Sequence, residues 1–197
     1  TLYQAEKRIP AVERSRGLGD VYKRQTLDCR KALDLFLRMV WHLTRGQQAE
    51  ATTFVWVGGD PEAIARATAE AEALGVGDHV RFVGIQADPV SWFALMDVFV
   101  LPSREDPFPL VCLEAEAVGC PVVSFDNGGM PELLTQGCGL VARYPDVAGL
   151  ADEVSALLGD AERRRSMGER GRELVREHHD VSVLAPKLWA DIEPWLR

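Results

Sequence analysis

Two acidic residues, Asp106 and Glu114, are separated by seven residues in a stretch that predicts a loop entering a helix. Pro109 favours a helix start at this point, because proline lacks an N–H group that the first turn would leave unpaired. The N–H groups of Leu110 and Val111 would then point out of the helix, where they can bind an anion such as a diphosphate. With the diphosphate there, Asp106 could accept hydrogen bonds from a hexose, and Glu114 could reach a ribose.

A purely structural interpretation of these acids stays open at this point. Asp106 could cap the helix, and Glu114 or Glu116 could be a solvated charge on it, because acidic residues are common near helix starts. The motifs that follow favour ligand binding, since paired glycines allow the chain to approach a ligand closely. A plain strand–helix turn is the alternative for the glycine pair. The motifs are Gly119–Cys–Pro–Val–Val123 and Gly128–Gly–Met–Pro–Glu132.

Helices alternating with short apolar strands must position these residues. We expect strands at 53–57, 80–83, 98–101, 121–125 and 140–141, and helices at 31–42, 61–74, 89–96, 109–118, 147–158, 161–178 and 183–195. Apolar strands separated by helices predict an α/β fold, a parallel sheet with helices on both faces. Ligands of such sheets bind at the carboxyl ends of the strands, where the loop after 98–101 would lie.

Composition restricts the class of protein. A length of 197 residues fits one domain, and 47% hydrophobic residues suffice to bury a core. The net charge of −8 argues against a nucleic-acid partner. The four cysteines and the histidines follow no metal-ligand spacing, and we expect no metal site. No transmembrane segment or signal peptide is found, which predicts a cytoplasmic protein.

Residues 1–25 differ from the rest of the chain. They contain six basic and three acidic residues in an otherwise acidic protein, and no helical or strand period emerges from residue 9 to residue 25. The string from Ser15 to Gln25 resembles translated sequencing-adaptor read-through, and an ordinary basic loop is the alternative. We therefore divide the chain into an atypical, non-native segment at 1–25 and a domain at 26–197.

The run from Val98 to Pro131 resembles the retaining nucleotide-sugar glycosyltransferases that have two facing Rossmann-like domains, the GT-B type, and within them family 4. The family motif is an acid, seven residues and Glu, followed by Gly-x-Pro-Val-Val and a Gly-Gly-x-Pro-Glu turn. The resemblance covers roughly residues 28–197 and is to the C-terminal, donor-binding domain. It implies a Rossmann-like three-layer fold that forms the C-terminal half of a GT-B enzyme.

The resemblance implies a role for each matching residue. Asp106 would contact the donor hexose, Glu114 would hold the ribose, and Lys31 would neutralise the diphosphate. The base would dock on backbone groups at Gly84 and Ile85. Backbone contacts to sugar and diphosphate would come from Phe108, Pro109, Leu110 and Val111. For Lys31, an exposed charge at a helix start is the alternative.

The chain departs from the family pattern at three places. Asp106 stands where the family usually has Glu, which shortens the reach of the carboxylate; Glu105 is a Glu but leaves eight residues before Glu114. Ala32 stands where a Gly usually follows the lysine. The glycine-rich turn expected before Arg30 is absent.

By resemblance, the intact protein transfers a hexosyl group with retention from a nucleoside-diphosphate sugar to an acceptor sugar, lipid or other small molecule. No cofactor or metal is expected. The acceptor domain would precede residue 26, the fragment alone would be inactive, and the full-length protein could be peripheral to the inner membrane face. Two alternatives remain: a GT-B-like epimerase or phosphorylase, and a non-catalytic α/β nucleotide-binding module.

Overall fold

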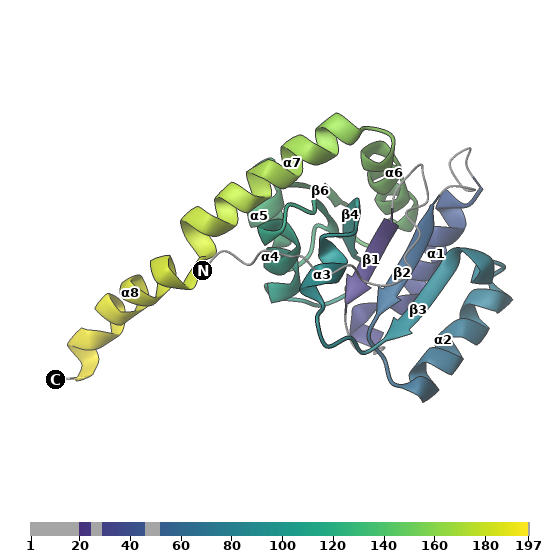
Figure 1. Ribbon diagram of the computed structural model, residues 1–197, viewed down its shortest axis with the longest axis horizontal. Helices are drawn as coiled ribbons and strands as arrows, with labels where there is room; N and C mark the ends of the chain where they lie inside the picture. Colours follow the sequence, from purple (N-terminus) through teal and green to yellow (C-terminus); the bar gives the residue numbers. More distant parts are fainter. Residues whose placement is uncertain (1–19, 25–28, 46–51, 197) are drawn as a thin grey trace.

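Six parallel strands form one sheet in the computed structural model, which describes residues 20–24, 29–45 and 52–196 (Figure 1). Their order is β3-β2-β1-β4-β5-β6, and all neighbouring strands are parallel. The strands are β1 (Asp20–Arg24), β2 (Thr53–Val57), β3 (Val80–Gly84), β4 (Val98–Leu101), β5 (Val122–Phe125) and β6 (Gly139–Ala142). The parallel sheet predicted from the short apolar strands is confirmed.

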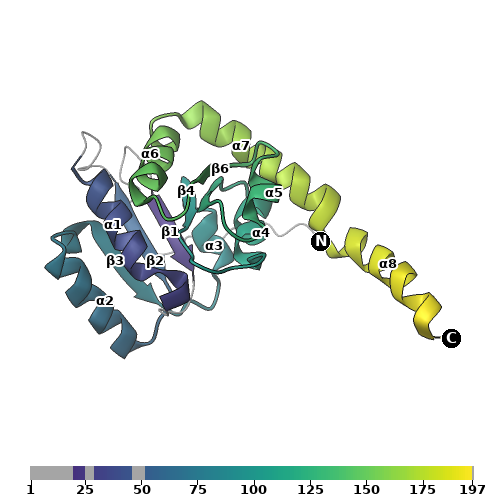
Figure 2. The same cartoon turned by 180° about the vertical axis from the view of Figure 1, so that it is seen from behind.

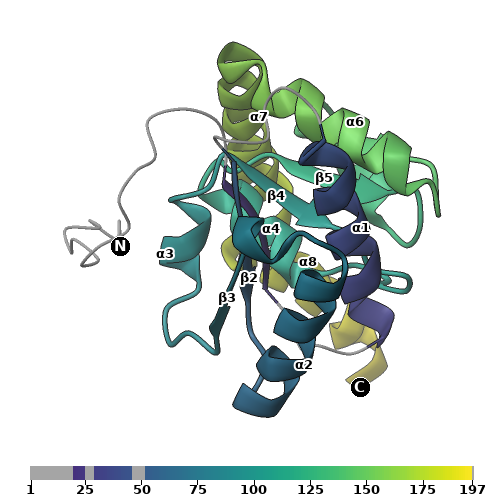
Figure 3. The same cartoon turned by 90° about the vertical axis from the view of Figure 1, so that its right-hand side faces the viewer.

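Helices cover both faces of this sheet. They are α1 (Leu33–Leu43), α2 (Pro61–Ala73), α3 (Val90–Phe93), α4 (Leu110–Ala117), α5 (Met130–Leu134), α6 (Val147–Leu158), α7 (Ala161–Leu174) and α8 (Val181–Ile192). Figure 2 shows α1, α2 and α6 on one face, and Figure 3 shows α3 on the side of the sheet opposite to α1. The predicted three-layer α/β arrangement is therefore confirmed.

Alternating strand residues build two separate cores, because successive side chains of a strand point to opposite faces. In β2, Phe54 and Trp56 pack with residues of α1 and α6. Val55 and Val57 pack instead with residues of α4 and α5. Burial on both faces explains why these strands are continuous apolar runs in the sequence.

Strand β1 was not predicted. It pairs with β2 on one side and β4 on the other, so the described sheet includes five residues of the segment that composition set apart. The run Asp-Val-Tyr-Lys-Arg has three charged residues and only two strand formers, which hides it from a search for apolar strands. Residues 1–19 and 25–28 lie outside the described residues, and the non-native origin of 1–25 stays a prediction.

Two helix starts that carry proline differ in detail. Asp60 accepts a hydrogen bond from the Ala63 N–H at 2.8 Å, with Pro61 as the first residue of α2, as predicted. Pro109 was predicted as the first residue of α4 but is its N-cap, with an extended backbone. The φ of −74° at Pro109 suits both positions, so the sequence did not distinguish them. The first helical N–H group is therefore that of Leu110.

The C-terminal helices leave the body of the domain. The helix predicted at 161–178 is α7 followed by a π-helical turn at Val175–His179. The next helix, α8, starts at Val181 and contains Pro186. It extends away from the sheet, as Figures 1 and 2 show from opposite sides.

Candidate functional site

The candidate site lies where the chain changes direction along the sheet. From β1 the chain continues through α1 to β2 on one side, whereas β4 lies on the other side of β1. The segment before α1 and the loop 102–109 after β4 therefore leave the same edge of the sheet at neighbouring strands. Such switch points at the carboxyl ends of parallel strands are where doubly wound folds bind ligands.

Lys31 and Asp106 meet at this switch point. The Lys31 Nζ atom donates to Asp106 Oδ2 at 2.6 Å, and the two side chains are only 12% and 15% exposed. Asp106 therefore does not cap α4, whose N-cap has no side-chain hydrogen bond. Lys31 is not an exposed helix-start charge either. The structure thus brings together the two residues that were predicted to contact the hexose and the diphosphate.

The backbone turn after Lys31 has an unusual conformation. Ala32 has a φ of +56°, in the left-handed region that favours glycine, and its side chain is buried. Its carbonyl oxygen accepts hydrogen bonds from the N–H groups of Leu35 and Phe36, which begin α1. This conformation explains why the glycosyltransferases that the chain resembles usually have glycine at the position of Ala32.

The loop that carries Asp106 is held by the loop after β5. The Asn127 side-chain amide donates to the carbonyl oxygens of Ser103 at 2.9 Å and Arg104 at 2.7 Å. The Gly129 N–H donates to the Pro107 carbonyl oxygen at 2.6 Å. Sequence analysis singled out the glycines but missed Asn127, although an amide directly before two glycines at a strand end is a signal for a loop clamp.

The glycine pair allows this contact because a larger residue would collide with the loop. A Cβ atom at Gly128 would lie 2.1 Å from the Asp106 carbonyl oxygen. A Cβ atom at Gly129 would lie 2.7 Å from both the Phe108 ring and the Pro107 carbonyl oxygen. The close approach predicted for these glycines is therefore an approach to the Asp106 loop.

Arg104 joins this loop to the start of α1. Its guanidinium donates two hydrogen bonds to the Asp34 carboxylate, at 2.8 and 2.7 Å, and its N–H donates to the Arg30 carbonyl oxygen at 2.8 Å. The bond from Arg104 lowers the pKa of Asp34 below its usual value. Sequence analysis missed this pair because 70 residues separate its members.

Helix α4 carries the other predicted ligand-binding residues. Leu110 at its start is exposed and Val111 is buried, while Glu114 is half-buried one turn further along. In a helix the first N–H groups lack partners within the helix, so the start of α4 can bind an anion next to Asp106. Phe108 and Pro109 form the entry to this turn.

Glu116, two residues beyond Glu114, is completely buried instead of solvated. Cys138 Sγ donates to its Oε1 atom at 3.0 Å, while Oε2 has no hydrogen-bond partner among the described residues. Burial raises the pKa of Glu116 to about 7, and the contact with Cys138 opposes this increase. This burial could not be predicted from the sequence, because Glu116 follows the pattern of an ordinary helix charge.

Gly84 and Ile85 lie at the same edge of the sheet but farther along it. Gly84 ends β3, and β2 separates β3 from β1. The Gly84 carbonyl oxygen accepts a hydrogen bond from the Gly58 N–H at 2.7 Å, and Ile85 is 80% exposed. The structure therefore does not bring this pair into contact with the Lys31–Asp106 pair.

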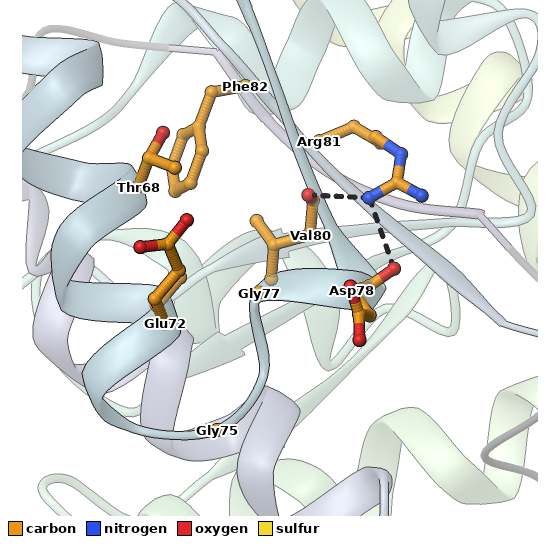
Figure 4. Close-up of a pocket in the computed structure, with 9 residues that line it drawn as sticks. Thr68, Glu72, Gly75, Gly77, Asp78, Val80, Arg81 and Phe82 are labelled. Atoms are coloured by element: carbon orange, nitrogen blue, oxygen red, sulfur yellow. Dashed lines mark hydrogen bonds between the residues drawn. The ribbon is translucent and has the colours of Figure 1, made fainter.

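A hollow of about 390 Å³ lies elsewhere, between α2 and β3 (Figure 4). Thr68 and Glu72 of α2 line it on one side, and Val80 and Phe82 on the other. The turn through Gly77 precedes β3, so this hollow is near the amino end of the strand. It is not part of the candidate site, which lies at the carboxyl ends.

No group of three or more His, Cys, Asp or Glu residues in residues 20–24, 29–45 and 52–196 is arranged to hold a metal ion. Within the same part of the chain, every helix is too short or too polar to span a membrane. Metal-independent binding stays a prediction.

Comparison with known proteins identifies relatives of the chain. The family Glycosyl transferases group 1 matches residues 24–160. The D-inositol 3-phosphate glycosyltransferase of Nocardia farcinica is 35% identical over 150 residues, which are 71% of this chain and 33% of the relative. A GDP-mannose-dependent phosphatidylinositol monomannoside mannosyltransferase of Mycolicibacterium smegmatis is 36% identical over 171 residues, 79% of this chain and 44% of the relative. The chain spans less than half of either relative.

Solved structures share the fold. HepE of Anabaena in complex with UDP-glucose aligns with a TM-score of 0.80 at 20% identity, over 91% of this chain and 49% of that one. The C-terminal domain of the group 1 glycosyl transferase LpcC from Francisella tularensis aligns with a TM-score of 0.71 at 22% identity, over 87% of this chain and 95% of that domain. With the switch-point site and the family match in place, the chain belongs to the group 1 glycosyl transferases of GT-B fold, as their C-terminal domain.

Proposed function

We propose that this chain is the donor-binding part of a glycosyltransferase that moves a hexosyl group from a nucleoside-diphosphate sugar to an acceptor with retention. The observation that carries the proposal is the Lys31–Asp106 pair at the switch point, beside the first turn of α4. A cation, an acid and free helix N–H groups are the groups needed for a diphosphate linked to a sugar.

Each group has a defined part in this function. The Lys31 ammonium and the N–H groups of Leu110 and Val111 stabilise the charge that develops on the leaving diphosphate. Asp106 accepts hydrogen bonds from the hexose hydroxyls, and Glu114 accepts them from the ribose. These residues supply positive charge without a metal ion, and backbone groups of Phe108 and Pro109 contact the sugar.

Gly84 and Ile85, which lie farther from the Lys31–Asp106 pair, would bind the base. They lie two strands from β1 at the same sheet edge, which leaves room for a nucleotide laid across β2 with its base at β3. The base is not assigned. UDP occurs in solved structures of the same fold, and GDP-mannose in the names of sequence relatives.

The complete protein would need a second domain for the acceptor. The chain covers a third of the length of the Nocardia farcinica relative, which leaves room for such a domain. We infer that the acceptor is a sugar, a lipid or another small molecule, and that the complete protein works in the cytoplasm or at the inner membrane face. The described domain alone binds nucleotide weakly and has no turnover.

Calorimetric titration of the purified chain with UDP, GDP and ADP tests the proposal. We expect saturable binding of one nucleotide, lost in Glu114→Ala because the ribose contact is removed. Glu105→Ala is the matched control, since Glu105 is an exposed acid of the same loop. A folded wild-type chain that binds none of the three, or equal binding by Glu114→Ala, contradicts the proposal.

A further inference from the structure

The loop of the candidate site contacts the C-terminal part of the chain through two aromatic rings. The centroids of Phe108 and His179 lie 5.7 Å apart, and their planes are inclined by 32°. This spacing is within the range of aromatic pairs that stabilise proteins. His179 is the last residue of the π-helical turn Val175–His179, between α7 and α8.

Phe108 also lies against the glycine pair. The Phe108 ring is so close to Gly129 that a Cβ atom there would be 2.7 Å from it. The residue before the ring, Pro107, accepts the hydrogen bond from the Gly129 N–H. Phe108 is therefore in contact with two elements, the loop after β5 and, through His179, the turn after α7.

His179 is suited to this contact by its surroundings. It is half-buried, and burial together with the neighbouring His178 lowers its pKa, which favours the neutral ring. His178 is exposed and lies 3.9 Å from Glu177. A π-helical turn changes the direction of side chains relative to a regular helix, and such turns are frequent at functional sites. Here the turn separates a ring that packs from a ring that is solvated.

We propose that His179 is a positioning residue of the donor site. Its ring packs on Phe108 and holds the loop 106–109 where Asp106 and the first N–H groups of α4 can face the donor. The proposal rests on the proposed function, because it concerns the same loop. It adds a residue that lies 65 positions beyond Glu114 in the chain and touches no ligand itself.

The test compares His179→Ala, His179→Phe and His178→Ala by two measurements. The first is the affinity for UDP and GDP by calorimetry. The second is the hydrogen exchange of the Gly129 amide by NMR, which reports on the loop because this amide is bonded to Pro107. The Asp126 amide, bonded to the Ala142 carbonyl oxygen where β5 ends, is the internal reference outside the loop 106–109.

We expect His179→Ala to weaken nucleotide binding about three- to tenfold and to accelerate Gly129 exchange by a similar factor. His179→Phe should restore both, because a phenyl ring keeps the packing, and His178→Ala should change neither. Unchanged Gly129 exchange in His179→Ala overturns the proposal, whatever happens to the affinity. So does an equal acceleration at Asp126, which would indicate general destabilisation.

The failure of the proposed function is distinguishable. If the wild-type chain binds none of UDP, GDP and ADP, the donor-site function fails, and the exchange measurement alone decides whether His179 positions the loop. If the wild-type chain binds and His179→Ala accelerates Gly129 exchange but leaves affinity unchanged, the positioning of the donor loop by His179 is overturned while the proposed function stands.

Discussion

Lys31 and Asp106 neutralise each other at 2.6 Å, so a phosphate that binds Lys31 must compete with a carboxylate already in place. The sequence predicted both residues as ligand contacts from the seven-residue spacing and from the resemblance. It could not predict that they contact each other, because 75 residues separate them and only the sheet order brings their segments together. For single residues, the sequence therefore predicts which side chains can bind a ligand better than it predicts which side chains contact each other.

Removing the competing carboxylate should strengthen nucleotide binding. We expect Asp106→Asn to raise the affinity for the nucleotide that binds, UDP or GDP, by about fivefold, since a partly buried ion pair is worth about 1 kcal/mol. Calorimetry measures the change in affinity. Glu105→Gln is the control, because it removes the same negative charge at the neighbouring, exposed residue. An equal gain in Glu105→Gln would indicate a general effect of charge, and a loss in Asp106→Asn would contradict the competition.

Glu116 makes the stability of the domain depend on pH. Its folded pKa of about 7 is above its usual 4.5, so the folded state holds the proton more tightly than the unfolded state between these values. The stability is therefore fully present below pH 4.5 and falls as the pH rises through about 7. Above this window the buried carboxylate is charged and costs roughly 2–3 kcal/mol.

Glu116→Gln should remove this dependence. We expect the free energy of unfolding of Glu116→Gln to exceed that of the wild type by roughly 2 kcal/mol at pH 8 and to match it near pH 4.5. Urea denaturation at the two pH values measures the difference. Glu169→Gln, an exposed residue of α7, should show no such difference, and the same pH dependence in wild type and Glu116→Gln would refute the assignment.

At the scale of elements, the site is an assembly of loops at one sheet edge. The sequence predicted strands β2 to β6, helices α1 to α4 and helices α6 to α8, because apolar runs and proline or glycine boundaries mark them. It missed β1, whose charged residues hide the strand. It also missed the Asn127 clamp and the Arg104–Asp34 pair, since hydrogen bonds between distant loops leave no periodic signal.

The contact between Gly128 and the Asp106 loop can be separated from backbone strain. Gly128 and Gly137 both have positive φ angles, +65° and +93°, but a Cβ at Gly137 would meet nothing closer than 3.8 Å. We expect Gly137→Ala to lower the free energy of unfolding by about 1 kcal/mol, the cost of positive φ alone. Gly128→Ala should lower the free energy of unfolding by roughly 2 kcal/mol more than Gly137→Ala, because the Asp106 carbonyl group must move. Urea denaturation distinguishes the two, and equal losses would show that the loop contact is not tight.

At the scale of the whole molecule, α8 stands out because none of its residues is buried. Its large apolar side chains are exposed, and in Figures 1 and 2 it points away from the sheet. They are Val181, Leu184, Leu188, Trp189 and Ile192. The sequence predicted the helix, but a helical pattern does not tell which surface a helix will cover. An exposed apolar surface of this kind promotes association.

We therefore expect the isolated chain to associate at high concentration through α8. The double substitution Leu188→Gln and Trp189→Gln should shift sedimentation-velocity profiles toward monomer without changing the thermal midpoint, since both side chains are exposed. Ile85→Gln removes an even more exposed apolar side chain, directly after β3, and should leave the profiles unchanged. Profiles that do not respond to the double substitution would rule out α8 as the contact.

The position of β1 has a consequence for the order of folding. β1 is the first strand along the described chain, yet it lies in the middle of the sheet and alone connects β2–β3 with β4–β5–β6. Its pairing of Val21 with Val98 requires closure of a long loop, which is entropically costly and slow, whereas β4 to β6 pair with nearer neighbours in the chain. We expect the two half-sheets to form first and their union across β1 to set the folding rate, so that the switch point between Lys31 and Asp106 is completed last.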